Sequence, residues 1–456
     1  MSIEVPSAAE QSGGELRPLM SLAWPLIGNN LAVAGMNFAD AVMAGRLSGR
    51  DLAAVAVGNS VWMLFFLAAL GTLMAISPLV SQAYGARRYR LTGAYVRQGF
   101  SIAVVLSLAI VLILVGGADT MMRIVGIDAE FRDLAVGYVE AIAWGAPAIC
   151  IYLVMRYGLE GIGHTRPILF VSVLALAANV GGNYVFMYGY LGAPALGAVG
   201  CGVASALAMW LMLGCLAVYM LLSKREDVRS LTRTRPETAG LKREILSLGI
   251  PIAANVVAEV GLFVAVSLIM GTLSANAAAA HQIAINYAST MFMVPMALAS
   301  AITVRVGHAL GEGRPHVARR RGLVGIGACG AFMTVSALVL LVFKDQIVSI
   351  YTTDPAVTSI AVSLLFMAAV FQISDGIQVG CAGALRGYKD TRIPFLLNLT
   401  AYWIIGFPLA VSALRRETPS PELVWLGFVV GLSVAAALLT WRYLGLSRRA
   451  AATTPP

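Results

Sequence analysis

The sequence has few charged residues. Asp, Glu, Lys and Arg make up only 12% of its 456 residues, whereas about 25% is usual in a soluble domain. Hydrophobic residues make up 59% of the chain. This balance excludes a water-soluble globular protein, whose surface needs more charge. It also excludes an intrinsically disordered chain, which contains far fewer apolar residues.

Cysteine is also scarce, and several catalytic motifs are missing. The chain has 5 Cys, all inside apolar stretches, so a disulfide-based scaffold is excluded. No Gly-rich segment is followed by Lys-Ser or Lys-Thr in the spacing of a nucleotide-binding P-loop, and no HExxH pair occurs. We therefore do not expect ATP-driven transport or intramembrane proteolysis, and we predict a protein that is not an enzyme and needs no cofactor.

The most prominent feature of the sequence is a series of long apolar runs. A membrane-crossing helix needs about 20 predominantly apolar residues, and twelve runs are compatible with this length. We predict an all-α membrane protein with twelve transmembrane helices, near residues 19–44, 52–80, 100–115, 134–155, 168–187, 195–222, 245–270, 277–304, 323–343, 357–384, 393–414 and 423–446.

The charges between these runs predict the orientation of the chain. If the loops alternate sides, 25 of the 32 Lys and Arg residues fall on the side that holds both termini. Because basic loops stay in the cytoplasm, we predict that both termini are cytoplasmic. The net charge of +9 is explained in this way and indicates no nucleic-acid partner. The acidic opening segment lacks a basic start, so we expect the first span, not a cleaved signal peptide, to direct insertion.

The chain contains an internal repeat with an offset of 226 residues. It pairs Pro25 with Pro251, Gly35 with Gly261 and, much further on, Thr165-Arg166 with Thr391-Arg392. Six spans per copy is an even number, so both copies enter the membrane from the same side. We predict two six-helix lobes, residues 1–222 and 245–456, related by a pseudo-two-fold axis along the membrane normal and joined by a solvated cytoplasmic linker, 223–244. Lobes of this kind are typical of transporters that work by alternating access.

Three acidic residues lie inside the predicted spans: Asp40, Glu259 and Asp375. Each costs roughly 2.5 to 3.5 kcal/mol at membrane depth. The fold does not require them, because the positions that match them in the repeat are occupied by Val266, Val33 and Ile149. A desolvated carboxyl without a basic neighbour takes up a proton or a cation. The candidates are therefore a coupling ion, H⁺ or Na⁺, and a lipophilic organic cation.

Glu259 and Asp375 belong to the same predicted lobe, so they could share one ion. Sodium prefers oxygen ligands, and Asn255 is a neighbour that could complete such a site. Glu259 and Asp375 are therefore the candidates for a Na⁺ site, with Asn255 as an accessory polar residue.

Several segments of the chain resemble the multidrug and toxic compound extrusion (MATE) family, in its NorM-like branch. They are residues 38–48 (FADAVMAGRLS), 51–60 (DLAAVAVGNS), 81–86 (SQAYGA), 280–284 (AHQIA) and 384–391 (ALRGYKDT), together with Glu259 and Asp375. The resemblance implies an antiporter of the bacterial inner membrane that exports cationic, lipophilic compounds in exchange for Na⁺ or H⁺. It further implies that Asp40, Glu259 and Asp375 carry the cation coupling. We expect a monomer whose partners are small organic cations and the lipid bilayer.

The same resemblance implies accessory positions. Asn183 resembles a polar residue near the first-span Asp, and Gln282 and Asn286 resemble residues that line the cleft. Phe371 stands where relatives often have Tyr four residues before the tenth-span Asp, so one hydroxyl ligand is missing there.

Two other classes of function fit the sequence less well. A flippase for lipid-linked oligosaccharides would place Arg or Lys in its cleft to bind pyrophosphate, whereas the spans of this chain offer acids. A membrane-embedded prenyl transferase would need clustered Asp residues on one segment, and none occurs.

Overall fold

The computed structural model describes residues 8–232, 240–415 and 420–452, and within these residues the regular structure is entirely helical. Eleven helices are long and apolar enough to cross a membrane, and a bent pair, α5 (Ala129–Ala143) with α6 (Ala146–Gly161), makes a twelfth span when counted as one. Each predicted span overlaps one of these crossings. The prediction of an all-α, multi-pass membrane protein is thus confirmed.

The remaining helices follow in chain order. The first half contains α1 (Ala8–Leu47), α2 (Gly49–Met74), α3 (Ile76–Gly85), α4 (Tyr89–Val125), α7 (Arg166–Gly182), the π-helix η1 (Asn183–Met187), η2 (Tyr190–Gly192), α8 (Ala198–Leu222) and α9 (Glu226–Thr232). The second half contains α10 (Leu241–Leu273), α11 (Ala275–Gly311), α12 (Pro315–Tyr351), α13 (Pro355–Gly387), α14 (Arg392–Leu399), the π-helix η3 (Thr400–Gly406), α15 (Phe407–Ser412), η4 (Ala413–Arg415) and α16 (Pro421–Ala452).

The span formed by α5 and α6 is bent by 45°. Pro147 is in the first turn of α6, where its missing N–H interrupts the backbone hydrogen bonds of a continuous helix. Gly145, at the break, lies against Ala206 and Met209 of α8. A side chain at this position would collide with α8, so Gly145 allows the two helices to pack closely at the break.

The chain folds into two compact units. One contains residues 25–253, and the other contains residues 1–24 and 254–456. The division falls inside α1, next to Pro25, and inside α10, just after Pro251. The first part of each of these two helices therefore belongs to one unit, and the rest of the same helix belongs to the other unit. The predicted lobes 1–222 and 245–456 describe chain order, whereas these units describe packing.

The first and fifth spans of each repeat run parallel and in the same register. In one unit, α1 and α7 are joined by a hydrogen bond between Asn29 and Ser172. In the other, α10 and α14 are joined by a hydrogen bond from Asn398 to Asn255, 2.8 Å long. Both pairs are 143 residues apart in sequence, and they occupy equivalent positions in the repeat with its offset of 226. The internal repeat is therefore also a repeat of helix packing.

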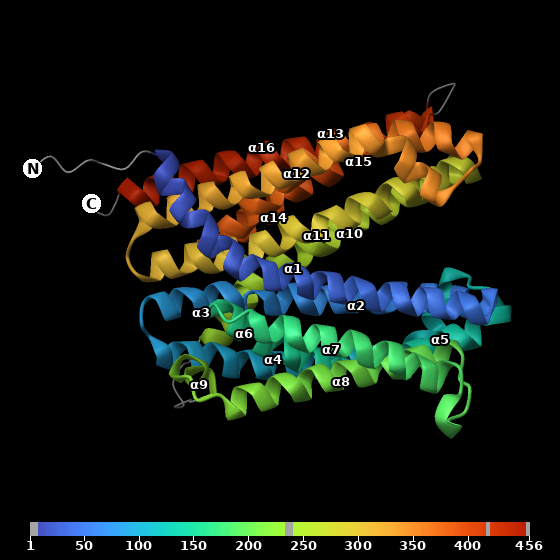
Figure 1. The fold of residues 1–456 in the computed structure, drawn as a ribbon, viewed down its shortest axis with the longest axis horizontal. Helices are drawn as coiled ribbons and strands as arrows, with labels where there is room; N and C mark the ends of the chain where they lie inside the picture. The colour runs from blue at the N-terminus through green and yellow to red at the C-terminus, as the bar shows by residue number, and fades with distance from the viewer. Residues whose placement is uncertain (1–7, 233–239, 416–419, 453–456) are drawn as a thin grey trace, which may run out of the picture. The chain divides into compact units, whose positions relative to one another are not determined.

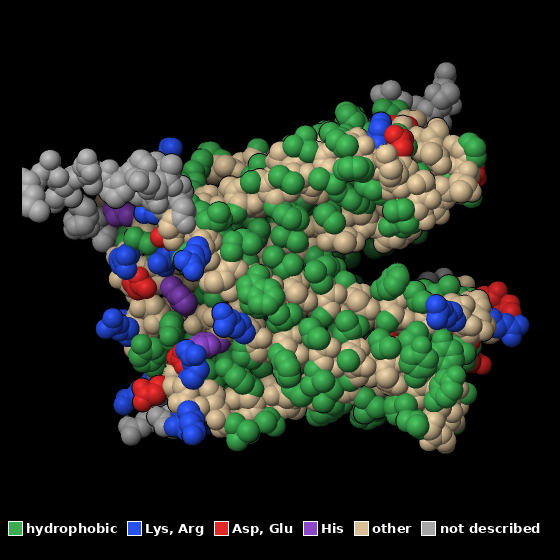
Figure 2. Space-filling model, in the orientation of Figure 1, with side chains coloured by type: hydrophobic (Ala, Val, Ile, Leu, Met, Phe, Trp, Pro, Cys, Tyr) green, Lys and Arg blue, Asp and Glu red, His purple; other side chains and the backbone are tan. Residues whose placement is uncertain are grey.

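The surface of the helices matches a bilayer environment. Figure 2 shows charged side chains gathered toward the two ends of the helices and hydrophobic side chains along their length. Within the unit that contains both, the start of α1 and the end of α16 lie at the same end (Figure 1). A chain that crosses the membrane an even number of times has its two ends on the same side.

Part of the predicted linker is packed against the protein and is not a solvated loop. Residues 233–239 lie outside the described residues, but α9, just before them, buries Val228 and Leu231. Leu231 lies near Gly158 of α6. The charged composition of residues 223–244 had suggested solvation, yet two apolar residues three positions apart are enough to dock one helical turn.

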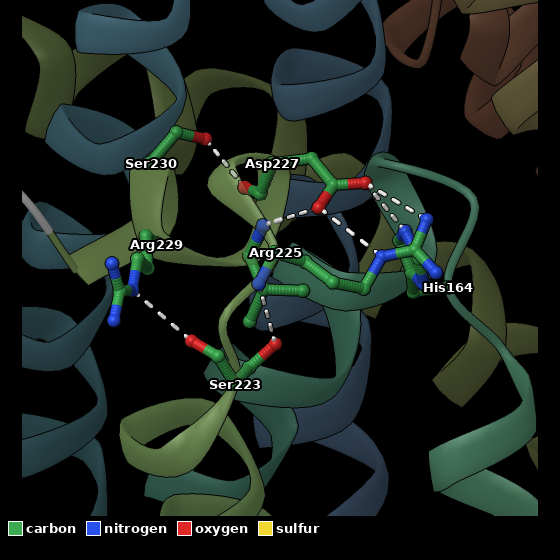
Figure 3. A network of polar contacts seen from close by, with 7 residues as sticks. His164, Ser223, Arg225, Asp227, Arg229 and Ser230 are labelled. Carbon is green, nitrogen blue, oxygen red and sulfur yellow. Dashed lines mark hydrogen bonds and ion pairs between the residues drawn. The ribbon is translucent and has the colours of Figure 1, made fainter.

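A polar network fixes α9 to the loop between α6 and α7 (Figure 3). The Nε2 atom of His164 donates a hydrogen bond to the Asp227 carboxylate over 2.7 Å, and Arg225 lies 3.4 Å from the same carboxylate. Burial alone would raise the pKa of Asp227, but hydrogen bonds from His164, the Val228 amide and Arg225 outweigh it and lower this pKa below its usual value. A pKa lowered by folding means that the ionised carboxylate stabilises the docked helix above about pH 4, and that this stabilisation disappears as the pH falls further.

Replacing Asp227 with Asn is expected to loosen α9 without unfolding the rest of the protein. Loss of a charge-assisted hydrogen bond removes about 1.5 kcal/mol, which corresponds to roughly a tenfold faster hydrogen–deuterium exchange over residues 226–232. Glu226→Gln is the matched control, because Glu226 is exposed on the same helix. Equal exchange in both variants would show that the network does not hold α9.

Candidate functional site

Asp40 lies in a pocket of neutral hydrogen-bond donors within the unit 25–253. The Nδ2 atom of Asn183 donates to Asp40 Oδ1 over 2.6 Å, and Ser205 Oγ donates to Asp40 Oδ2 over 3.1 Å. Asn179 in turn donates to Ser205, and the Cys201 thiol also lies within hydrogen-bonding reach of Asp40. All these side chains are buried. Both carboxylate oxygens are thus satisfied, but no positive charge neutralises them within the described part of the chain.

A π-helix positions Asn183 in this pocket. The regular helix α7 ends at Gly182, and the wider turn of η1 begins at Asn183. Such π segments frequently occur at functional sites because they redirect a side chain within a helix. Asn179 and Asn183 are one turn apart and reach the pocket from α7 and η1. Asn179, Cys201 and Ser205 were not selected from the sequence, although each is a polar or thiol residue within an apolar span.

The other two acids converge in the second unit. Glu259 lies on α10 and Asp375 on α13, and the two carboxyls interact electrostatically. Tyr402, on the π-helix η3, interacts with both of them. Asp375 and Tyr402 are buried, while Glu259 is partly exposed. Three helices thus bring two carboxyls and a phenol together.

This second site differs from the Asp40 pocket in its hydrogen bonds. Asp375 Oδ1 is buried and has no hydrogen-bond partner. Neither Glu259 nor Asp375 forms an ion pair with a basic side chain within the described residues, although Glu259 interacts electrostatically with Arg386 further along α13. Two neighbouring carboxyls repel one another when both are ionised, so this arrangement favours the uptake of a proton or a cation.

The site contains too few acidic groups for a typical multivalent metal centre. Within residues 8–232, 240–415 and 420–452, no group of three or more His, Cys, Asp and Glu side chains is placed to hold a metal ion. Asn255, predicted as an accessory residue, uses its side-chain oxygen to accept the hydrogen bond of Asn398. It lies one turn before Glu259 on α10, at the edge of the site.

The other predicted accessory residues occupy different surroundings. Gln282 and Asn286 are exposed and one turn apart on α11. Phe371 is buried one turn before Asp375 and packs against Trp425 and Phe428 in an aromatic cluster. The aromatic ring at position 371 therefore serves packing, and the hydroxyl near the acids comes from Tyr402 on another helix.

The hydrogen bonds of His281 keep this buried residue in one neutral form. The Trp425 indole N–H donates to His281 Nδ1 over 3.1 Å. Since an indole nitrogen is only a donor, Nδ1 carries no proton, and the hydrogen of the neutral ring is on Nε2, 2.8 Å from Ser267 Oγ. A second proton on the ring would break the bond to Trp425. His281 therefore serves as a structural link between α11 and α16.

Comparison with known proteins identifies the family. The model of the MatE family matches residues 25–185 and 251–412, which together make up more than two thirds of the chain. The chain belongs to the MatE family. The two matched segments begin at Pro25 and Pro251, so the family model finds the same repeat that the sequence shows. MatE proteins are transporters, and the chain is accordingly a multi-pass membrane transporter.

Solved structures of MATE transporters have the same fold. A MATE protein crystallised in a bent conformation has a TM-score of 0.87 at 20% identity, with 98% of this chain and 100% of that chain covered. The eukaryotic MATE transporter AtDTX14 has a TM-score of 0.83 at 21% identity, with 97% and 99% covered. A MOP superfamily transporter from Pyrococcus furiosus has a TM-score of 0.86 at 19% identity, with 96% of each chain covered, and is described as having a binding pocket of reverse polarity.

Proposed function

We propose that this MatE protein is a secondary active antiporter that exports lipophilic organic cations in exchange for inward Na⁺ or H⁺. The observation that carries the proposal is the pair Glu259 and Asp375, two neighbouring carboxyls in a membrane-spanning bundle with no ion pair to a basic side chain in the described residues. Acids inside a membrane are typical of ion pathways and coupling sites. Binding and release of a cation at these two residues would couple the ion gradient to transport.

Asp40 provides a second acidic position, in the other unit. Its carboxylate is held by neutral donors, so its negative charge remains available to a cation. We propose that Asp40 also takes part in cation coupling, either with the coupling ion or with the organic cation. Exposed polar residues of α11, Gln282 and Asn286, are proposed to contact the substrate.

The proposed location is the bacterial inner membrane, with both termini in the cytoplasm and the protein acting as a monomer. The excess of Lys and Arg on the side of the termini supports this orientation. A flippase for lipid-linked oligosaccharides is less well supported, because pyrophosphate binding requires cationic donors where these two sites offer carboxyls.

A transport assay with separately imposed gradients tests this function. Purified protein in liposomes is expected to move a cationic fluorescent dye against its gradient when either a Na⁺ gradient or a pH gradient is applied, but not in the absence of both. The gradient that drives movement identifies the coupling ion. Dye movement that depends only on added ATP, or efficient movement of an anionic lipid-linked sugar instead, would contradict the proposal.

A further inference from the structure

Tyr402 places a buried hydroxyl beside the two acids of the second unit. Its side chain is fully buried, and its hydroxyl makes no hydrogen bond of good geometry. The register of the helices explains its position. Asn255 and Asn398 are bonded across α10 and α14, and one turn further along both helices come Glu259 and Tyr402. The Trp403 indole N–H, which donates to the Ala258 carbonyl over 3.0 Å, holds η3 against α10 at the same level.

Gln378 adds a second unpaired oxygen. It lies three residues after Asp375, on the same face of α13, and it is 2% exposed. Its side-chain oxygen has no hydrogen-bond partner, although the side chain lies next to the Tyr402 hydroxyl. The Asn398 side-chain oxygen, one turn before Tyr402, is also buried and unpaired. A buried oxygen that is left without a partner is unfavourable, because it has lost its hydrogen bonds to water.

The chemistry of this group favours a cation over further hydrogen bonds. The carboxylates of Glu259 and Asp375 and the side-chain oxygens of Gln378 and Asn398 are all hydrogen-bond acceptors. One proton neutralises one carboxylate and leaves the amide oxygens unpaired. A hard monovalent cation interacts with carboxylate, hydroxyl and amide oxygens at the same time, because oxygen atoms are its preferred ligands.

We propose that the Tyr402 hydroxyl and the Gln378 side-chain oxygen are ligands of a sodium ion held by Glu259 and Asp375. This inference rests on the proposed function and makes it more specific, because it adds two neutral oxygen ligands to the acidic pair. The oxygen ligands belong to one unit only. In the repeat, Leu176 corresponds to Tyr402, Tyr152 to Gln378 and Ile149 to Asp375, so the fold itself does not require them.

Sodium binding to the purified full-length protein tests the proposal. Binding of radioactive ²²Na⁺ is measured in detergent at pH 8, with choline chloride keeping the ionic strength constant. Tyr402→Phe removes one oxygen and keeps the ring, and it is expected to weaken sodium affinity about tenfold. Gln378→Met, which keeps the length of the side chain, is expected to have a similar effect.

Tyr152→Phe is the matched control. Tyr152 is also a buried tyrosine whose hydroxyl lacks a hydrogen bond of good geometry, but it lies in the other unit. Its replacement should leave sodium affinity unchanged. The melting temperature of each variant, measured in choline chloride, shows whether it folds like the parent.

The outcomes separate this inference from the proposed function. If Asp375→Asn abolishes sodium binding while Tyr402→Phe and Gln378→Met bind as tightly as the parent, the two neutral ligands are wrong but the acidic coupling site stands. If the parent protein binds no sodium, the sodium site is overturned, and transport driven by a pH gradient would still support the antiporter. If neither gradient drives dye movement in the parent, the proposed function fails, whatever the sodium affinity.

Discussion

Asp375→Asn is expected to lower gradient-driven export by about 100-fold in liposomes, and Glu259→Gln is expected to lower it nearly as much. An amide has nearly the same shape as a carboxyl but carries no negative charge, so it neither binds a proton reversibly nor attracts a cation. A contact between a carboxylate and a charged partner contributes about 1.5 to 3 kcal/mol, and 1.4 kcal/mol corresponds to tenfold in affinity. Loss of one of two carboxyls therefore removes most of the coupling.

The measurement is the initial rate of dye accumulation at equal amounts of reconstituted protein. Asp345→Asn is the control, because Asp345 is an exposed acid of α12 and its loss should leave the rate unchanged. Dye binding at equilibrium, measured in detergent, distinguishes a coupling defect from loss of the substrate site. Asp375→Asn and Glu259→Gln variants that both export dye at the parental rate would refute the role of these acids.

Glu15→Gln is expected to produce the largest loss of stability. Glu15, on the first half of α1, forms an ion pair with Arg305 of α11 and another, 3.4 Å long, with Arg321 of α12. The side chains of Arg305 and Glu15 are only 9% and 15% exposed. Removing one partner of a buried ion pair costs about 3 to 5 kcal/mol, because the other charge remains buried without a counter-charge. We expect the melting temperature to fall by about 10 °C.

A double variant tests this explanation. Replacing Arg305 with Met in the Glu15→Gln background should restore much of the lost stability, because an apolar side chain has no charge to desolvate. Glu312→Gln is the control, since Glu312 pairs with an Arg314 side chain that is 59% exposed, and surface ion pairs contribute little. If Glu15→Gln melts like the parent, the first half of α1 is not held by this ion pair.

The same pair explains why α1 is shared between the two units. Leu19 and Ala23 belong to an apolar cluster with Leu298 and Ile302 of α11, and Glu15 adds the ionic contact. In the other unit, the first half of α10 is anchored by the hydrogen bond from Tyr95 to Glu244, 2.7 Å long. Each unit is thus completed by the beginning of a helix whose second half belongs to the other unit.

Local patterns in the sequence were enough to predict the spans. Lipid offers no hydrogen-bond partners to the backbone, so an apolar run of sufficient length must form a helix. The bent span, α5 with α6, also follows a local signal, the Gly145 and Pro147 within it. The docking of α9 was missed because the composition of the linker outweighed two apolar residues, Val228 and Leu231, whose partners are distant in sequence.

The candidate sites were predicted only in part. Asp40, Glu259 and Asp375 stand out because a charge inside an apolar run is costly wherever it lies. Tyr402 and Gln378 do not stand out, since a single Tyr or Gln is common in a membrane span. A usable signal was nevertheless present: the pairs Asn255 with Asn398 and Glu259 with Tyr402 share one separation, 143 residues, as expected for two parallel helices in register.

The sequence by itself determined that the chain crosses the membrane repeatedly, that it contains two copies of one unit, and which acids lie at membrane depth. These properties depend on hydropathy and on spacing along one chain, which are local. Only the tertiary structure decided that Asp40 is surrounded by donors while Glu259 and Asp375 face unpaired oxygens. That difference depends on which helices meet, because the groups that distant segments place around a carboxyl determine its hydrogen bonds.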